Sequence, residues 1–134
     1  MNPATEEEAV ALAKETDDTN LIICPPFPYL KSVASVVQKA KLGAQDLFWS
    51  SPTGPYTGEV SATELKNIGI KYVIIGHSER RNNLGETNEM VAKKMVAAIK
   101  EGLIPVVCIG ETLEEKQSGQ REEVLSKQLR IGLS

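Results

Sequence analysis

The sequence is 134 residues long, the usual size of one domain, which argues against a large multidomain protein or a repeat array. Fifteen Lys and Arg residues against eighteen Asp and Glu residues give a formal net charge of -3. This balance argues against a nucleic-acid partner or an anionic membrane surface. With 41% hydrophobic and 25% charged residues, the composition is that of a soluble globular protein rather than a disordered one.

Helix and strand patterns alternate through the first third of the chain. Thr5 and Glu8 have the spacing of a capping box, which predicts the start of a short first helix. The apolar run at 21–24, stopped by prolines, predicts a strand covered on both faces. Apolar residues at helical spacing predict an amphipathic helix over 30–41, and a short strand is expected at 43–45.

The alternation continues to the end of the sequence. Two further capping boxes, Ser61 with Glu64 and Thr112 with Glu115, predict two helix starts. The other predicted elements are a helix at 61–68, a strand at 71–76, a helix carrying Val91, Met95, Ala98 and Ile99, a strand at 103–110, and a helical segment through Val124, Leu125 and Leu129. This order indicates the α/β class, with a parallel sheet and right-handed crossovers. Because a helix precedes the first strand and the last pattern is helical, we expect a segment of something longer.

Three features of the sequence predict a cytoplasmic protein without a metal or cofactor. The longest apolar runs are far shorter than the roughly 20 residues of a membrane helix, and the N-terminal residues lack the pattern of a secretory signal. Two cysteines, Cys24 and Cys108, are too few for a disulfide framework, and we expect both to be reduced. The two cysteines and the single histidine do not have the spacing of a zinc site. No Walker-type or GxGxxG loop for binding phosphate or a dinucleotide is present.

A polar cluster directly follows the predicted strand at 71–76. The only histidine, His77, comes first, and Ser78, Glu79 and two arginines follow it. In parallel α/β folds the carboxyl ends of the strands are where ligands bind, so this cluster is a candidate site. Position alone leaves the alternative open that His77 bonds within its turn and that the charged residues form ion pairs. Cys108, near the end of the last strand, is expected in the core rather than as a nucleophile.

The segment 48–60 is a long irregular loop that is rich in Gly, Pro and Ser. Loops of this length are usually functional or disordered. Trp49 and Tyr56 favour an ordered loop, because aromatic side chains are enriched at interfaces. Two alternatives remain open at this point: the loop docks on a partner, or it folds on its own domain.

The stretch Tyr72–Arg81, which reads YVIIGHSERR, closely resembles the triosephosphate isomerase family. The resemblance extends in order along essentially the whole chain. Further matching motifs are PPFPYL at 25–30, GAQD at 43–46, YTGEVS at 56–61 and CIGET at 108–112. The resemblance implies about half of a (β/α)8 barrel with parallel strands. Residues 1–134 would form a partial domain that lacks strand 1 and strands 6 to 8 of the family's barrel.

The resemblance also implies a function. Members of this family interconvert dihydroxyacetone phosphate and D-glyceraldehyde 3-phosphate through an enediol, without a cofactor, in glycolysis and gluconeogenesis. The whole enzyme would be a cytoplasmic homodimer. The family's general base, its catalytic lysine and its phosphate-binding loops correspond to segments outside this chain, and Glu111 does not match the base. We therefore expect the isolated chain to be inactive.

Roles for single residues follow from the same resemblance. His77 matches the family's electrophile, a neutral imidazole that polarises the substrate oxygen and moves protons around the enediol. Glu79, Ser78 and Cys108 match supporting positions of the site. The predicted dimer-interface residues are Thr57, Gln45, Glu59 and Arg80, with Thr57 at the loop tip reaching into the neighbouring subunit's site. The 48–60 loop departs from the family pattern around Ser51 to Pro55. This departure bears on how the loop docks on the neighbouring subunit.

Two other functions are compatible with the sequence. The chain could be a half-barrel without catalysis that serves as a binding or assembly module. A doubly wound flavodoxin-like domain is a weaker alternative, because the turn after the first strand is rich in proline rather than shaped to hold phosphate.

Overall fold

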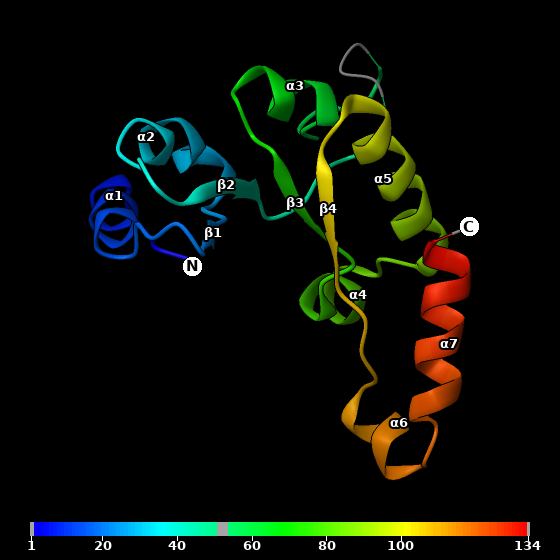
Figure 1. Ribbon diagram of the computed structural model, residues 1–134. Helices are drawn as coiled ribbons and strands as arrows, with labels where there is room; N and C mark the ends of the chain where they lie inside the picture. Colours follow the sequence, from blue (N-terminus) through cyan, green and yellow to red (C-terminus); the bar gives the residue numbers. More distant parts are fainter. Residues whose placement is uncertain (1, 51–53, 134) are drawn as a thin grey trace.

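A four-stranded parallel sheet lies at the centre of the structure (Figure 1). The computed structural model describes residues 2–50 and 54–133. The strands are β1 (Ile22–Ile23), β2 (Lys41–Ala44), β3 (Tyr72–Ile75) and β4 (Ile104–Val107). They pair in the order β1-β2-β3-β4, all parallel, which confirms the predicted α/β class. A sheet whose order follows the sequence has no switch point, which argues against the doubly wound alternative.

Helices cover one face of the sheet. They are α1 (Glu6–Glu15), α2 (Leu30–Ala34), α3 (Ala62–Asn67) and α5 (Asn88–Glu101). Strand residues Val73 and Ile75 are fully buried against α3 and α5, and Ile23 is buried against α1 and α2. On the opposite face Ile22, Ile104 and Val106 are 41%, 51% and 40% exposed. The prediction of a first strand covered on both faces is therefore wrong within the described residues, because the helices pack on one side only.

The capping patterns set the helix starts. The boxes of Ser61 with Glu64 and of Thr112 with Glu115 are both complete, and they begin α3 and α6 (Leu113–Gln117). At α1 only half of the predicted box forms. The Thr5 hydroxyl accepts from the Glu8 N–H, whereas the Glu8 carboxylate accepts from the N–H of Ala4. The first bond satisfies an amide that the first helical turn leaves unpaired, and the second ties the residue before the N-cap to the helix.

The helix predicted over 30–41 is much shorter in the structure. A 3₁₀ turn, η1 (Phe27–Tyr29), leads into α2, which ends at Ala34. The Asp17 carboxylate then accepts hydrogen bonds from the N–H groups of Gln38, Lys39 and Ala40, at 2.9, 2.9 and 2.7 Å. A helix would direct those three N–H groups to its own carbonyls, so the carboxylate stabilises a turn instead.

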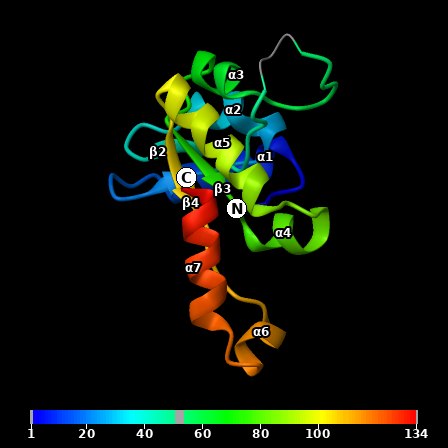
Figure 2. The same cartoon turned by 90° about the vertical axis from the view of Figure 1, so that its right-hand side faces the viewer.

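Three more helices lie near the carboxyl ends of the last two strands. The helix α4 (Ser78–Leu84) follows β3 immediately. The helix α6 follows β4, and α7 (Arg121–Gly132) runs back from α6 to α5. Together, α6 and the adjoining part of α7 project well beyond the sheet (Figures 1 and 2). Gly132 packs at this contact, where an added Cβ would lie 3.4 Å from Val91 Cγ1. The predicted last helix is confirmed.

Candidate functional site

The candidate site is built at the carboxyl end of β3, where the strand passes directly into α4. His77 is the N-cap residue of that helix, and its Nδ1 accepts a hydrogen bond from the Glu79 N–H at 3.3 Å. A ring nitrogen that accepts carries no proton. The neutral ring in this arrangement therefore carries its proton on Nε2, where it is available to donate.

The imidazole lies at the surface of two hollows. Its side chain is 44% exposed, and Ser78 and Glu79 beside it are exposed. One hollow, of about 990 Å³, opens on the uncovered face of the sheet and is also lined by Gln45 and Ile74. The other, of about 570 Å³, lies between α4 and the segment after β4, and Cys108 lines it. The structure thus brings His77, Ser78, Glu79 and Cys108 to the same end of the sheet.

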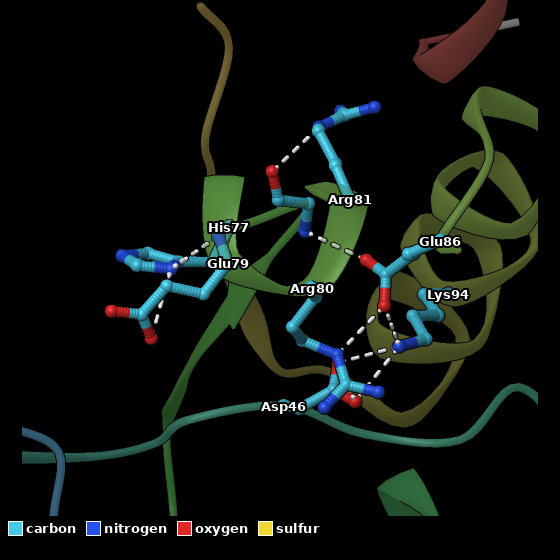
Figure 3. Close-up of polar contacts among 8 residues, drawn as sticks. Asp46, His77, Glu79, Arg80, Arg81, Glu86 and Lys94 are labelled. Carbon is cyan, nitrogen blue, oxygen red and sulfur yellow. Dashed lines mark hydrogen bonds and ion pairs between the residues drawn. The ribbon is translucent and has the colours of Figure 1, made fainter. Parts of the chain in front are cut away.

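A buried ionic cluster lies beneath this turn (Figure 3). Lys94 of α5 is 2% exposed, and its ammonium donates to both Asp46 carboxylate oxygens, at 2.7 and 2.8 Å, and to Glu86 Oε2. Arg80 Nε lies 2.9 Å from Asp46 Oδ2 and 2.8 Å from Glu86 Oε2. Two cations and two carboxyl groups thus satisfy one another, with Arg80 at the partly exposed side of the cluster and the other three side chains buried.

The pKa values of the two carboxyl groups of the cluster shift in opposite directions. Burial raises the pKa of the Asp46 carboxyl, against the opposing hydrogen bond from Lys94 and the charges of Lys94 and Arg80. Burial acts on Glu86 as well, but hydrogen bonds from Lys94 and Arg80 outweigh it and hold the pKa of that carboxyl below its ordinary value. Glu86 is therefore the member of the cluster whose ionised form the surroundings favour.

The cluster was not predicted, although the sequence contains one signal for it. Lys94 shares the apolar face of α5 with Val91, Met95 and Ala98, all buried. A charged side chain on such a face requires a buried partner. The partners Asp46 and Glu86 are 48 and 8 residues away in sequence, so periodicity within the helix could not identify them.

Cys108 and Cys24 are partly buried free thiols. Burial raises the pKa of both thiols, and the Arg81 charge opposes this at Cys108. Neutral thiols are weak nucleophiles. The expectation that Cys108 lies in the core is wrong, because the residue is half-buried and lines the second hollow. The N–H of Cys108 donates to the Ile75 carbonyl at 2.8 Å, which fixes the segment after β4 to the end of β3.

The base of the 48–60 loop packs on its own chain. The Phe48 ring lies 4.2 Å from the Trp49 ring and 4.7 Å from the Tyr56 ring, centroid to centroid, and the Phe48 N–H donates to the Val60 carbonyl at 2.8 Å. Between Tyr56 and Val60 of this base, Thr57 and Glu59 are exposed. Ser51, part of the predicted departure from the family pattern, lies outside the described residues.

The other two predicted interface residues contact their own chain. Gln45 Nε2 donates to the Cys24 carbonyl at 3.1 Å. Arg80 belongs to the ionic cluster, with its side chain 33% exposed. These contacts do not test a role between subunits, which stays a prediction for both residues.

Neither a metal centre nor a membrane span is found where the structure describes the chain. Over residues 2–50 and 54–133, no group of three His, Cys, Asp or Glu side chains is arranged to hold a metal ion. In the same ranges no helix is both long and apolar enough to cross a bilayer.

The order of the strands and the polar turn after β3 define a class of protein: a singly wound parallel α/β fold with its candidate site at the carboxyl ends of the strands. The sequence model of the family described as "Triosephosphate isomerase" matches residues 2–134. This chain belongs to the triosephosphate isomerase family.

Curated relatives named triosephosphate isomerase agree with this assignment. The chain is similar to the protein of Dictyoglomus thermophilum, with 47% identity over 129 residues that cover 95% of this chain and 51% of that protein. It is 44% identical to the Moorella thermoacetica protein over 140 residues, covering 99% of this chain and 56% of that protein. The chain thus spans about half the length of the curated relatives it matches.

Proposed function

We propose that this chain is part of a triosephosphate isomerase, which interconverts dihydroxyacetone phosphate and D-glyceraldehyde 3-phosphate through an enediol in glycolysis and gluconeogenesis. Family membership supports this activity. The observation that carries the role of the site is the geometry of His77, whose Nδ1 accepts from the Glu79 N–H and leaves the Nε2 proton free to donate. A donor aimed at a substrate oxygen stabilises the negative charge that develops there.

His77 is the proposed electrophile, and it would also carry protons between the two enediol oxygens. Glu79, Ser78 and Cys108 are proposed as supporting residues of the site. Glu79 supplies the N–H that fixes the His77 ring, and Cys108 lines the second hollow. The general base and the catalytic lysine would come from outside this chain, so the chain by itself is expected to lack activity.

The whole protein is proposed to act as a cytoplasmic homodimer. Thr57, Glu59, Gln45 and Arg80 are the proposed interface residues. Exposure of Thr57 and Glu59, which lie between Tyr56 and Val60 of the loop base, supports a contact with another subunit. Neither a nucleic acid nor a membrane is proposed as a partner, in line with the net charge of -3.

A chimera tests the proposed activity, because it joins this chain to the segments of a relative that lie outside the matched region. The 95% of this chain that aligns with the Dictyoglomus thermophilum relative would replace the matched region of that protein, to which it is 47% identical. We expect the purified chimera to interconvert the two triose phosphates in a coupled assay. The host protein without the matched region is the control, and it should show no turnover.

The outcome is decided by folding and activity measured together. A chimera with the circular dichroism and cooperative unfolding of the host, but without isomerase activity, would contradict the proposed function. An active chimera would show that this chain carries a competent share of the active site.

A further inference from the structure

The side chain of Arg81 turns back from α4 onto the ends of β3 and β4. Its Nε donates to the Gly76 carbonyl at 2.7 Å, as drawn in Figure 3, and its Nη2 lies within hydrogen-bonding distance of the Cys108 carbonyl at 3.4 Å. Its Nη1 donates to Asn88 Oδ1, at the start of α5, at 2.7 Å. One guanidinium therefore connects the residue before His77, the segment after β4 and the next helix.

The two carbonyls that Arg81 contacts lie where the sheet ladder stops. The last paired residues of β3 and β4 are Ile75 and Val107. The carbonyls of Gly76 and Cys108 come one residue later on each strand, beyond that pair. Buried or half-buried backbone carbonyls need donors, and here the guanidinium takes the place of a further ladder bond.

Gly76 is held from its other side as well. Its N–H donates to Glu86 Oε1 at 3.1 Å, so the ionic cluster and Arg81 bind opposite ends of this one residue. Gly76 has a φ of +77°, which favours glycine. A Cβ at this position would lie 2.7 Å from Arg81 Nη2 and 3.1 Å from the Cys108 carbonyl oxygen. The guanidinium is thus packed directly against the backbone that leads into His77.

We propose that Arg81 is a positioning residue, which with Glu86 fixes the Gly76 backbone and thereby the direction in which β3 presents the His77 imidazole. This inference rests on the proposed role of His77 and extends it to a residue that does not touch the reacting atoms. The role requires arginine, because a planar guanidinium donates in several fixed directions at once. A lysine at this position would place one nitrogen where the guanidinium has three, so it could not reach all the acceptors that Nε, Nη1 and Nη2 contact separately.

The test uses the 134-residue chain labelled with ¹⁵N and four variants: Arg81→Met, Arg81→Lys, Asn88→Ala and Arg130→Met. The readout is the pair of ¹⁵N signals of the His77 ring, which report the tautomer. A merely structural role of Arg81 would lower stability without changing the tautomer. The second readout is amide hydrogen exchange of Glu79 and Cys108, whose N–H groups bond at the two strand ends.

In the unaltered chain the ring signals should be those of the Nε2–H tautomer. Arg81→Met should move both signals toward the average of the two tautomers and speed the two amide exchanges about tenfold or more, as expected for losing bonds to a charged group. Arg81→Lys should give an intermediate shift. Arg130→Met, on the exposed side of α7, should change neither readout.

Asn88→Ala keeps the arginine and frees only its Nη1, so it decides the question if Arg81→Met does not fold. It should shift the ring signals in the same direction by a smaller amount. Unchanged ring signals in every folded variant of Arg81 and Asn88 would overturn the proposal. The outcome is independent of the chimera assay, because ring signals do not depend on turnover.

Discussion

Lys94 shows how a single residue connects the core to the candidate site. Its ammonium is almost completely removed from water. It contacts the carboxylates of Asp46, in the segment after β2, and of Glu86, just before α5. One of these carboxylates, that of Glu86, in turn accepts from the N–H of Gly76. The stability of the cluster and the placement of the His77 turn therefore depend on the same side chains.

Replacing Lys94 with methionine should destabilise the chain strongly. The methionine fills similar space, but it leaves Asp46 and Glu86 with Arg80 as their one remaining cation in the cluster. Removing one partner of a buried ion pair typically costs about 3–5 kcal/mol. Urea unfolding followed by circular dichroism should show a large decrease in the unfolding midpoint.

Lys100→Met is the matched control for this prediction, because Lys100 lies on the same helix with its side chain exposed. It should change the free energy of unfolding by about 0.5 kcal/mol or less. Equal midpoints for the two variants would show that the cluster contributes nothing to stability.

At the scale of elements, the turn between α2 and β2 depends on a carboxylate from a distant part of the chain. The Asp17 side chain follows α1 and binds the turn that leads into β2. Hydrogen bonds from the Ala40 and Gln38 N–H groups lower the pKa of Asp17 from its ordinary value of 3.8. A carboxyl with a lowered pKa in the folded state stabilises that state wherever it is ionised.

Asp17→Asn should reduce stability at neutral pH, because the amide carries no charge and offers one acceptor oxygen for three N–H groups. The contribution of Asp17 is complete above pH 3.8 and is lost as the pH falls through the lower folded-state value. The difference in urea midpoint between this variant and the unaltered chain should therefore shrink in acid. Glu15→Gln, at the exposed end of α1, is the control. A difference that stays constant down to low pH would contradict this account.

Local signals in the sequence predict most elements of the fold. Capping pairs such as Ser61 with Glu64 act within one helical turn, and both complete boxes form as predicted. The helix predicted over 30–41 is too long because its apolar spacing continues past Ala34. The Asp17 carboxylate, which holds the N–H groups of 38–40 in a turn, lies more than 20 residues before them. Long-range bonds of this kind leave no periodic pattern.

The candidate site divides in the same way. The position of His77 after an apolar strand, and the family motif around it, could be recognised from the sequence. The cluster beneath it could not, because Asp46, Glu86 and Lys94 meet through tertiary packing. The inward turn of Arg81 likewise depends on Gly76 and Cys108 being neighbours across two strands.

For the whole molecule, the main feature is the uncovered face of the sheet. Ile22, Ile104 and Val106 expose large apolar side chains there, and β1 and β4 form the two edges of the sheet. Exposed apolar faces and unpaired strand edges favour association. We expect the 134-residue chain by itself to self-associate in sedimentation velocity experiments.

Val106→Lys should weaken this self-association by about tenfold or more, since burial of one such side chain contributes about 1.5–3 kcal/mol. Val96→Lys is the control, because Val96 is 60% exposed on α5, away from the open face. A monomeric unaltered chain, or equal effects of the two variants, would show that the open face does not drive association.

The central claim is that this chain supplies the electrophile of a triosephosphate isomerase, and kcat of the chimera with His77→Gln tests it most directly. The variant should fold like the parent chimera and lose about 10²–10⁴ in kcat, the usual contribution of a positioned proton donor. Lys39→Gln, in the exposed turn before β2, is the control and should leave kcat unchanged. A folded His77→Gln chimera that retains full kcat would contradict the claim.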